Sequence, residues 1–184
     1  MFLFKPKFKF KDIKDILPVH KTRKWKRRKR NNILEIIIHH SAAISKKGKG
    51  LEEIENIAIY HKSLGNHISK RGCPGICYPW VIDRDGVIYK TSDHENITWH
   101  CKRHNLRGLG ICLLGKFTKG GQKPTLDQLR SLEKLLFYLS STLKVSIHHV
   151  YCHRDFKNTI CPGDLLYYYV CLRKAYPKIF IKDF

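Results

Sequence analysis

The sequence is short of acidic residues and has no long apolar run. It contains 15 Asp and Glu against 36 Lys and Arg, which gives a formal net charge of +21. A field of this strength favours polyanionic partners, among which charge alone does not separate nucleic acid, anionic membranes and anionic cell-wall polymers. No stretch is long and apolar enough to span a bilayer, so the sequence predicts no transmembrane helix.

The N-terminus also lacks the continuous apolar region of a secretory signal. In "MFLFKPKFKFK" a lysine or proline occupies nearly every second position from Lys5. The alternation of Phe and Lys suits a short strand, or an arm that contacts a membrane surface. Because no export signal is visible and the seven cysteines are odd in number, reduced thiols are the default expectation.

Positive charge is concentrated at the start of the chain. Residues 1–30 hold 13 Lys and Arg and only two acids, so they carry +11, most densely in "KTRKWKRRKR". Both a solvated basic arm and a targeting role fit this pattern. No nucleic-acid-binding module accompanies the arm, and only Trp25 interrupts its dense part, so nucleic acid is not favoured. We predict a basic extension over residues 1–31 and one domain over residues 32–184.

Strand patterns recur along the predicted domain. The β-branched run "ILEIIIHH" at 33–40 and the apolar run "LGICLLG" at 109–115 are typical of buried strands. "YPWVIDRDGVIYK" at 78–90 reads as a hairpin around Asp85-Gly86. "VSIHHVYCH" at 145–153 predicts a further short strand.

Helix patterns lie between and after these strands. In "LEEIENIAIYHKSLG" five apolar residues share one helical face before Gly65, and they are Leu51, Ile54, Ile57, Ala58 and Leu64. "PTLDQLRSLEKLLFYLSSTLK" opens with a capping box of Thr125 and Gln128, and "DLLYYYVCLRKAY" stops at Pro177. With no internal repeat, the sequence predicts an α/β fold: a single domain with a central mixed β-sheet flanked by about three helices.

A candidate metal site stands out near the C-terminus. His153 and Cys161 are eight residues apart in the polar stretch "HRDFKNTICPG". Neutral imidazole and thiolate are zinc ligands, and a catalytic zinc site uses three of them and leaves one position for water. The third candidate is His39 or His40, of which only one faces the site because side chains alternate along a strand. A packed structural cysteine and a hydrogen-bonded strand-end histidine are the alternatives.

Four segments in order resemble a known family. They are "IIIHHSA", "YPWVIDRDGVIY", "WHCKRHNLRGLGICLLG" and "HRDFKNTICPGD". Together they resemble the zinc-dependent N-acetylmuramoyl-L-alanine amidases of the type-2 class, which include peptidoglycan recognition proteins and the lysozyme-like amidases of some bacteriophages. The resemblance covers roughly residues 33–175 and includes the eight-residue spacing from histidine to cysteine.

This resemblance implies a site and a reaction. His39, His153 and Cys161 would hold one Zn²⁺ per chain, with His40 on the other face of the sheet. Tyr78 matches the catalytic tyrosine, and Thr159 falls where the family places Thr or Lys near the metal. Binding-only members generally lack the cysteine, so its presence implies a hydrolase that cuts the amide between N-acetylmuramic acid and L-alanine in peptidoglycan.

The resemblance also places a substrate groove. His100 and Asn105 match a segment that lines it, and Trp99 beside them would stack on a sugar. Ordinary loop hydrogen bonds, core packing of Trp99 and strand packing of Tyr78 are the alternatives. Pro79 departs from the family pattern, in which a polar residue often follows the tyrosine. No general base is assigned, since the glutamates of the first helix, Glu52, Glu53 and Glu55, are expected to face the surface.

The other cysteines and the biological role each have more than one interpretation. Cys73 and Cys77 would form either a disulfide beside Tyr78 or two reduced thiols, while Cys101, Cys112, Cys152 and Cys171 are expected to be packed. The basic extension favours a lytic, phage-type endolysin that stays in the host cytoplasm until lysis. It would attract the enzyme to anionic envelope polymers or lipopolysaccharide without taking part in hydrolysis. A non-catalytic peptidoglycan-binding module and a cytoplasmic cell-wall recycling amidase are the alternatives.

Overall fold

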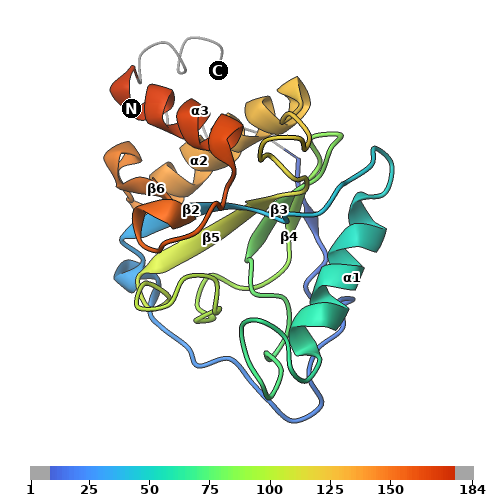
Figure 1. Ribbon diagram of the computed structural model, residues 1–184. Coiled ribbons are helices and arrows are strands. Elements are labelled where there is room, and N and C mark those ends of the chain that lie inside the picture. The colour runs from blue at the N-terminus through green and yellow to red at the C-terminus, as the bar shows by residue number, and fades with distance from the viewer. Residues whose placement is uncertain (1–8, 177–184) are drawn as a thin grey trace.

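The computed structural model describes residues 9–176, and one mixed sheet organises them (Figure 1). The six strands lie in the order β1-β4-β3-β5-β2-β6. Only β3 and β4 are antiparallel; every other neighbouring pair is parallel. The strand bounds are β1 Lys11–Asp12, β2 Glu35–His40, β3 Trp80–Ile82, β4 Ile88–Lys90, β5 Gly108–Leu113 and β6 Val150–Cys152.

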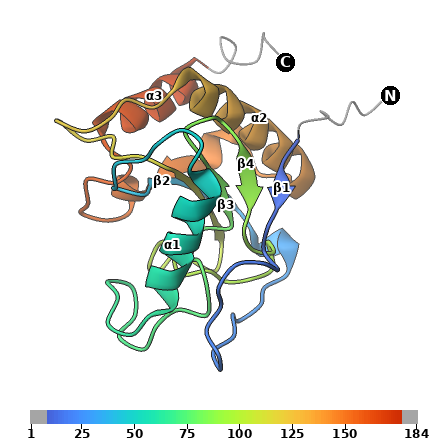
Figure 2. The same cartoon turned by 90° about the vertical axis from the view of Figure 1, so that its right-hand side faces the viewer.

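Three helices cover the two faces of this sheet, as Figures 1 and 2 show. Helix α1 Gly50–Lys62 packs on one face, and its Ile54 and Ala58 belong to the same buried cluster as Val81 of β3. Helices α2 Leu126–Leu143 and α3 Asp164–Ala175 pack on the other face around Ile36 and Ile38 of β2. The predicted single α/β domain with a mixed sheet and three helices is confirmed.

The central strands are buried on both faces, which explains their continuous apolar sequences. All residues of β2 and of β5 are buried, and the two strands run side by side from Glu35 opposite Gly108 to His40 opposite Leu113. Strand β6 lies on the other side of β2, where Ile38 is opposite Cys152. The carboxyl ends of three parallel strands therefore meet at one edge of the sheet, where α/β folds commonly hold their ligands.

Several local predictions are confirmed, and some need correction. The Thr125–Gln128 capping box begins α2, and β3 and β4 form the hairpin, with Gly86 at φ +78° in its turn. The predicted strand over 145–153 is shorter, because residues 147–149 form a 3-10 turn before β6. Leu51 and Leu64, expected on the buried face of α1, are exposed. Pro177 lies outside the described residues.

The described part of the basic extension is packed against the domain, which corrects the interpretation as a solvated arm. Strand β1 pairs with β4 at the edge of the sheet, and Ile13 and Leu17 join the core beneath α1. Further along, the side chain of Arg28 is buried. That residues 1–31 and residues 32–184 differ in function stays a prediction. In the structure, residues 9–31 are continuous with the rest of the domain. No helix among the described residues is long and apolar enough to cross a membrane.

Candidate active site

Three predicted ligands meet at the carboxyl edge of the sheet. The ligand atoms of His39, His153 and Cys161 all lie within 4.8 Å of one another. Cys161 Sγ is 3.7 Å from Nδ1 of His39, and the ring centroids of His39 and His153 are 4.6 Å apart. Two imidazoles and a thiol gathered in this way form a donor set that suits zinc.

The parallel pairing of β2 and β6 brings the two histidines together. Because Ile38 is opposite Cys152, the next residues, His39 within β2 and His153 just after β6, lie side by side. His40 points to the opposite face, as strand alternation predicts, and its Nδ1 accepts a hydrogen bond from the Phe117 N–H at 3.2 Å.

The loop after β6 closes on itself and so delivers the cysteine. The backbone N–H of Arg154 donates to the Cys161 carbonyl at 3.0 Å, and the Arg154 guanidinium donates to the Ile160 carbonyl at 2.6 Å. The Thr159 hydroxyl accepts from the Cys161 N–H at 3.3 Å. The polar residues between His153 and Cys161 therefore build a turn whose length returns the thiol to the imidazoles.

Burial sets the protonation of these groups. It lowers the pKa of His39 well below the usual value and the pKa of His153 to about 4, with Lys157 adding to the second shift. Both imidazoles are thus neutral near pH 7, the form that can donate a lone pair to a metal. Burial raises the pKa of the Cys161 thiol to about 12, although the backbone N–H of His40 acts in the opposite direction. A bound divalent cation would reverse that balance and favour the thiolate.

The outer nitrogen of His39 is held by a second histidine. His39 Nε2 lies 3.0 Å from Nδ1 of His100, and His100 Nε2 lies 3.2 Å from the Gly108 carbonyl. Histidines that bind metals commonly have such a partner on the other ring nitrogen. His100 lines the cleft with both ring nitrogens engaged within the protein, and its predicted role in substrate binding stays a prediction.

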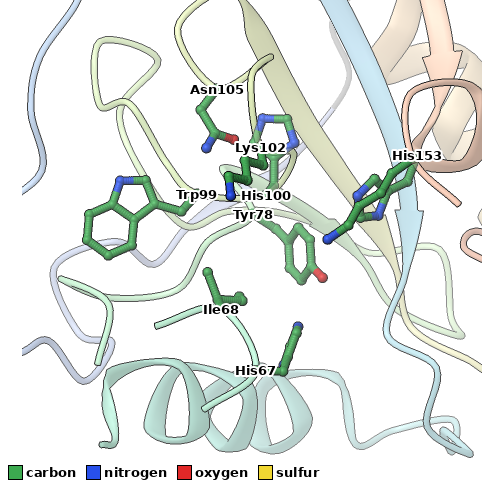
Figure 3. A pocket seen from close by; sticks show the side chains of 9 residues that line it. His67, Ile68, Tyr78, Trp99, His100, Lys102, Asn105 and His153 are labelled. Atoms are coloured by element: carbon green, nitrogen blue, oxygen red, sulfur yellow. The ribbon is translucent and has the colours of Figure 1, made fainter. Parts of the chain in front are cut away.

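A cleft of about 470 Å³ opens beside the three ligands (Figure 3). Figure 3 shows Trp99 and His153 on opposite sides of it, with the Tyr78 hydroxyl directed toward the space between His67 and His153. The cleft is lined by His67, Ile68, Tyr78, Trp99, His100, Lys102, Asn105, His153 and Lys157. None of these lining residues is acidic, so the cleft presents a neutral to positive surface.

Tyr78 lies between the three predicted ligands and helix α1. Its ring centroid is 5.2 Å from that of His39 and 5.5 Å from that of His61 on α1. Burial raises the pKa of Tyr78 well above its usual value, so the hydroxyl keeps its proton and can donate a hydrogen bond. Thr159 is half-buried behind the cysteine and is not among the residues that line the cleft.

The basic extension supports the far wall of the cleft. Trp99 lines the cleft and is contacted by two residues of the extension: the Arg23 guanidinium lies 4.9 Å from its ring centroid, and the Trp25 ring lies 5.4 Å away, edge on. Asn105 is also on the wall, and its side-chain oxygen accepts a hydrogen bond from the Cys101 N–H at 2.7 Å. This oxygen therefore makes the ordinary hydrogen bond within a loop that was the alternative to substrate binding.

Sequence reasoning missed several residues around the cleft. Lys102, Lys157, His67 and Ile68 line it, and none of them was singled out from the sequence. The available signals were the position of Lys102 in the segment "WHCKRHNLRGLGICLLG" and that of Lys157 in the polar loop "HRDFKNTICPG". Among the remaining cysteines, Cys73 and Cys77 are buried free thiols, whereas Cys171, expected to be packed, is exposed.

Comparison with known sequences finds a family whose model matches most of the chain. The profile of a family described as N-acetylmuramoyl-L-alanine amidase matches residues 29–164. The endolysin of Enterobacteria phage K11 is 26% identical over 138 residues, which are 73% of this chain and 83% of the endolysin. An N-acetylmuramoyl-L-alanine amidase of Sus scrofa is 29% identical over 55% of this chain, but that match spans only 17% of the pig protein.

Solved structures of an amidase and of a peptidoglycan recognition protein have a fold similar to that of this chain. An N-acetylmuramoyl-L-alanine amidase, LysC from Clostridium intestinale, superposes with a TM-score of 0.61 at 25% identity and covers 89% of this chain and 97% of its own. Peptidoglycan recognition protein LE, solved with tracheal cytotoxin, superposes with a TM-score of 0.75 at 23% identity, over 89% of this chain and 92% of its own. The second similarity is one of fold alone.

Proposed function

The chain belongs to the family of N-acetylmuramoyl-L-alanine amidases, and from this premise we propose that it is a zinc-dependent, phage-type endolysin. The reaction is hydrolysis of the amide that joins N-acetylmuramic acid to L-alanine in peptidoglycan. The observation that carries this proposal is the meeting of His39, His153 and Cys161 beside the cleft. Similarity to phage endolysins over most of their length supports the lytic role.

The three side chains fit a catalytic zinc ion. Two neutral imidazoles and one thiolate would leave a net charge of about +1 at the metal, so it would remain a Lewis acid. Zinc bound there would lower the pKa of a water molecule toward neutrality and polarise the scissile carbonyl. The hydrogen bond from His39 to His100 supports this assignment, because it leaves Nδ1 of His39 facing the other two ligands.

The chain's own residues would bind and orient the substrate. The protonated Tyr78 hydroxyl would donate to the oxygen on which negative charge develops in the transition state. Trp99 offers a flat apolar face on the opposite wall, suited to a sugar ring. Lys102 and Lys157 would attract carboxylates of the stem peptide, because no acidic side chain among the lining residues competes for them.

A positive outer surface supports attraction to anionic envelope polymers or lipopolysaccharide. Within the densest basic stretch, six cationic side chains are exposed: Lys21, Lys24, Lys26, Arg27, Lys29 and Arg30. Charges on a surface of one sign raise the local concentration of a polyanionic substrate and the rate of encounter with it. The exposed charges would thus recruit the enzyme to the wall, while their folded neighbours Arg23 and Arg28 belong to the scaffold.

The experiment is product analysis on purified sacculi. Mass spectrometry should detect free L-alanine amino termini on released peptides and intact N-acetylmuramic acid on the glycan. Chelation should abolish this release, and added Zn²⁺ should restore it. Cleavage between sugars or within the stem peptide would contradict the proposed bond, whereas binding without any release would favour the non-catalytic peptidoglycan-binding module.

A further inference from the structure

Arg28 differs from every other cation in the dense basic stretch around it. Its side chain is only 6% exposed, while those of Arg27 and Lys29 on either side are exposed. The guanidinium donates to four backbone carbonyls, those of His94 at 2.9 Å, Asn105 at 2.8 Å, Leu106 at 2.9 Å and Gly108 at 2.8 Å. A buried guanidinium that gathers carbonyls from one loop fixes the path of that loop.

The Gly108 carbonyl needs this partner because no strand supplies one. The preceding carbonyl, that of Arg107, accepts from Leu34 and Glu35 on the β2 side. Successive carbonyls of a strand point in opposite directions, so the Gly108 carbonyl faces the β3 side. Strand β3 pairs with β5 only from Ile111 onward, and the Gly108 oxygen is satisfied by Arg28 and His100 instead.

These contacts determine which nitrogen of His39 carries hydrogen. A carbonyl can only accept, so Nε2 of His100 must donate to Gly108, and Nδ1 of the neutral His100 ring is left as an acceptor. His39 Nε2 must then donate to that Nδ1. The lone pair of His39 is therefore on Nδ1, the atom that faces Cys161 Sγ.

Close packing keeps the intermediate histidine in place. A Cβ atom added at Gly110 would lie 2.9 Å from Cγ of His100 and 3.0 Å from its Nδ1. The ring thus rests directly on the backbone of β5, and it cannot move toward the strand. The hydrogen bond from Nε2 to the Gly108 carbonyl further restricts rotation of the ring about its Cβ–Cγ bond.

We propose that Arg28 is a positioning residue of the metal site: through the Gly108 carbonyl and His100 it holds His39 in the tautomer that leaves Nδ1 free for the metal. This inference rests on the proposed zinc-dependent function. It assigns to the basic extension a part in catalysis that its charge pattern does not suggest. Arg28 contacts none of the three ligands, and it meets the lining of the cleft only at the backbone carbonyl of Asn105.

The loop that Arg28 holds has a second anchor, so its loss should leave the protein folded. Glu35 at the start of β2 accepts from His104 Nδ1 at 2.6 Å and from Arg107 Nε at 3.3 Å. These bonds attach the same loop to the sheet from the other side. Removal of Arg28 should therefore loosen the direction of the Gly108 carbonyl rather than release the whole loop.

The test compares Arg28→Gln with Arg27→Gln, two adjacent changes that remove the same charge. Zinc affinity is measured by competition with a chromophoric chelator, with circular dichroism as the check on folding. Arg28→Gln should bind zinc about 10-fold more weakly. This is the lower end of the loss in metal affinity, about 10- to 100-fold, that follows when a hydrogen-bond partner of a metal ligand is removed. Arg27→Gln should bind zinc as tightly as the parent. Arg28→Lys, which keeps the charge but loses the fork of donors, should fall between them.

A second readout needs no metal and no activity. Nitrogen-15 NMR of the metal-free parent should show hydrogen on Nε2 of His39, and Arg28→Gln should show a mixture of tautomers. Hydrogen on Nδ1 in the parent, or a folded Arg28→Gln with the zinc affinity and tautomer of the parent, would overturn the inference. If the parent bound no zinc, the proposed function would fail, while the tautomer measurement would still decide the role of Arg28.

Discussion

The two ends of the cleft are built in different ways. The proposed metal end, consisting of His39, His153 and Cys161, lies at the carboxyl ends of paired parallel strands and a closed turn. The groove wall, consisting of Trp99 with Arg23 and Trp25 behind it, is made of irregular segments that hold one another through ring contacts. The first arrangement fixes atoms for chemistry, and the second shapes a surface for a ligand. Changes at the metal end should therefore reduce turnover, and changes at the wall should reduce affinity.

The largest effect is expected from removal of the thiol. Cys161→Ala should lose most of the bound zinc and at least about 1000-fold in rate, because Lewis-acid stabilisation is worth several kcal/mol. Metal analysis and turnover on a soluble muropeptide would measure both. The control is Cys171→Ala, which removes an exposed thiol on α3. Unchanged zinc stoichiometry in Cys161→Ala would remove this residue from the site.

A neighbouring control separates the two faces of β2. His40→Ala should keep the zinc of the parent, since the His40 ring contacts Phe117 on the opposite side of the sheet. If His40→Ala alone emptied the site, the assignment of the strand faces would be reversed.

The next largest effect concerns a hydrogen-bond donor beside the metal end. Tyr78→Phe should keep zinc and fold but lose roughly 100- to 1000-fold in turnover, as is usual for removal of one oxyanion-type donor. The Michaelis constant should change little, because the ring that packs against His39 and His61 is retained. Steady-state kinetics on a soluble muropeptide would measure both quantities, and turnover within a few-fold of the parent would reduce Tyr78 to a packing role.

A pH effect on stability is expected from the helix behind Tyr78. His61 accepts a hydrogen bond from the Cys77 N–H at 3.1 Å, and burial lowers its pKa from 6.5 to about 4. The unfolded chain therefore binds more protons than the folded one below pH 6.5. As the pH falls toward 4, His61 should reduce the free energy of unfolding by up to about 3 kcal/mol.

Urea unfolding of the metal-free protein at pH 7 and pH 4 would measure this change. His61→Gln keeps an acceptor but cannot titrate, so it should lose less stability over the same interval than the parent. An equal loss in the two proteins would show that His61 does not contribute to the acid sensitivity.

A smaller effect is expected at the groove wall. Trp25→Ala removes the edge contact that supports Trp99, and aromatic pairs are worth about 0.5–1.5 kcal/mol. The Michaelis constant should rise up to about 10-fold, with turnover and zinc content unchanged. Lys24→Ala, an exposed neighbour, is the matched control. A fall in turnover without a change in the Michaelis constant would contradict the division between wall and metal end.

The smallest effect is expected from the exposed charges. Replacement of Lys24, Lys26, Arg27 and Lys29 by Gln should slow lysis of whole walls a few-fold at low salt and leave turnover on a soluble muropeptide unchanged. The difference in lysis rate between variant and parent should disappear as the salt concentration rises, because exposed charges are screened within roughly 8 Å at physiological ionic strength. A defect that persisted at high salt would show that these residues act by contact rather than by long-range attraction.

The division between the two ends also explains what the sequence could predict. Periodicity and capping signals located β2, β5, the hairpin and α2, and the His-to-Cys spacing pointed to residues that the structure brings together. The groove wall was only partly predictable. Arg28 looks the same in sequence as the exposed cations around it, because an irregular segment has no period that marks its buried positions. Its partners lie 66 to 80 residues away, beyond any local signal.

The parallel pairing of β2 with β6 has a consequence for the order in which activity appears. Cys161 and its partner His39 are 122 positions apart along the chain. Contacts between such distant segments form late, since the entropy of closing a long loop opposes them until the intervening chain has ordered. During synthesis, no nascent chain that ends before Cys161 carries the full set of ligands. We expect the enzyme to be inactive until β6 pairs with β2 and Cys161 reaches His39. The appearance of hydrolytic activity would then show that this part of the fold is complete.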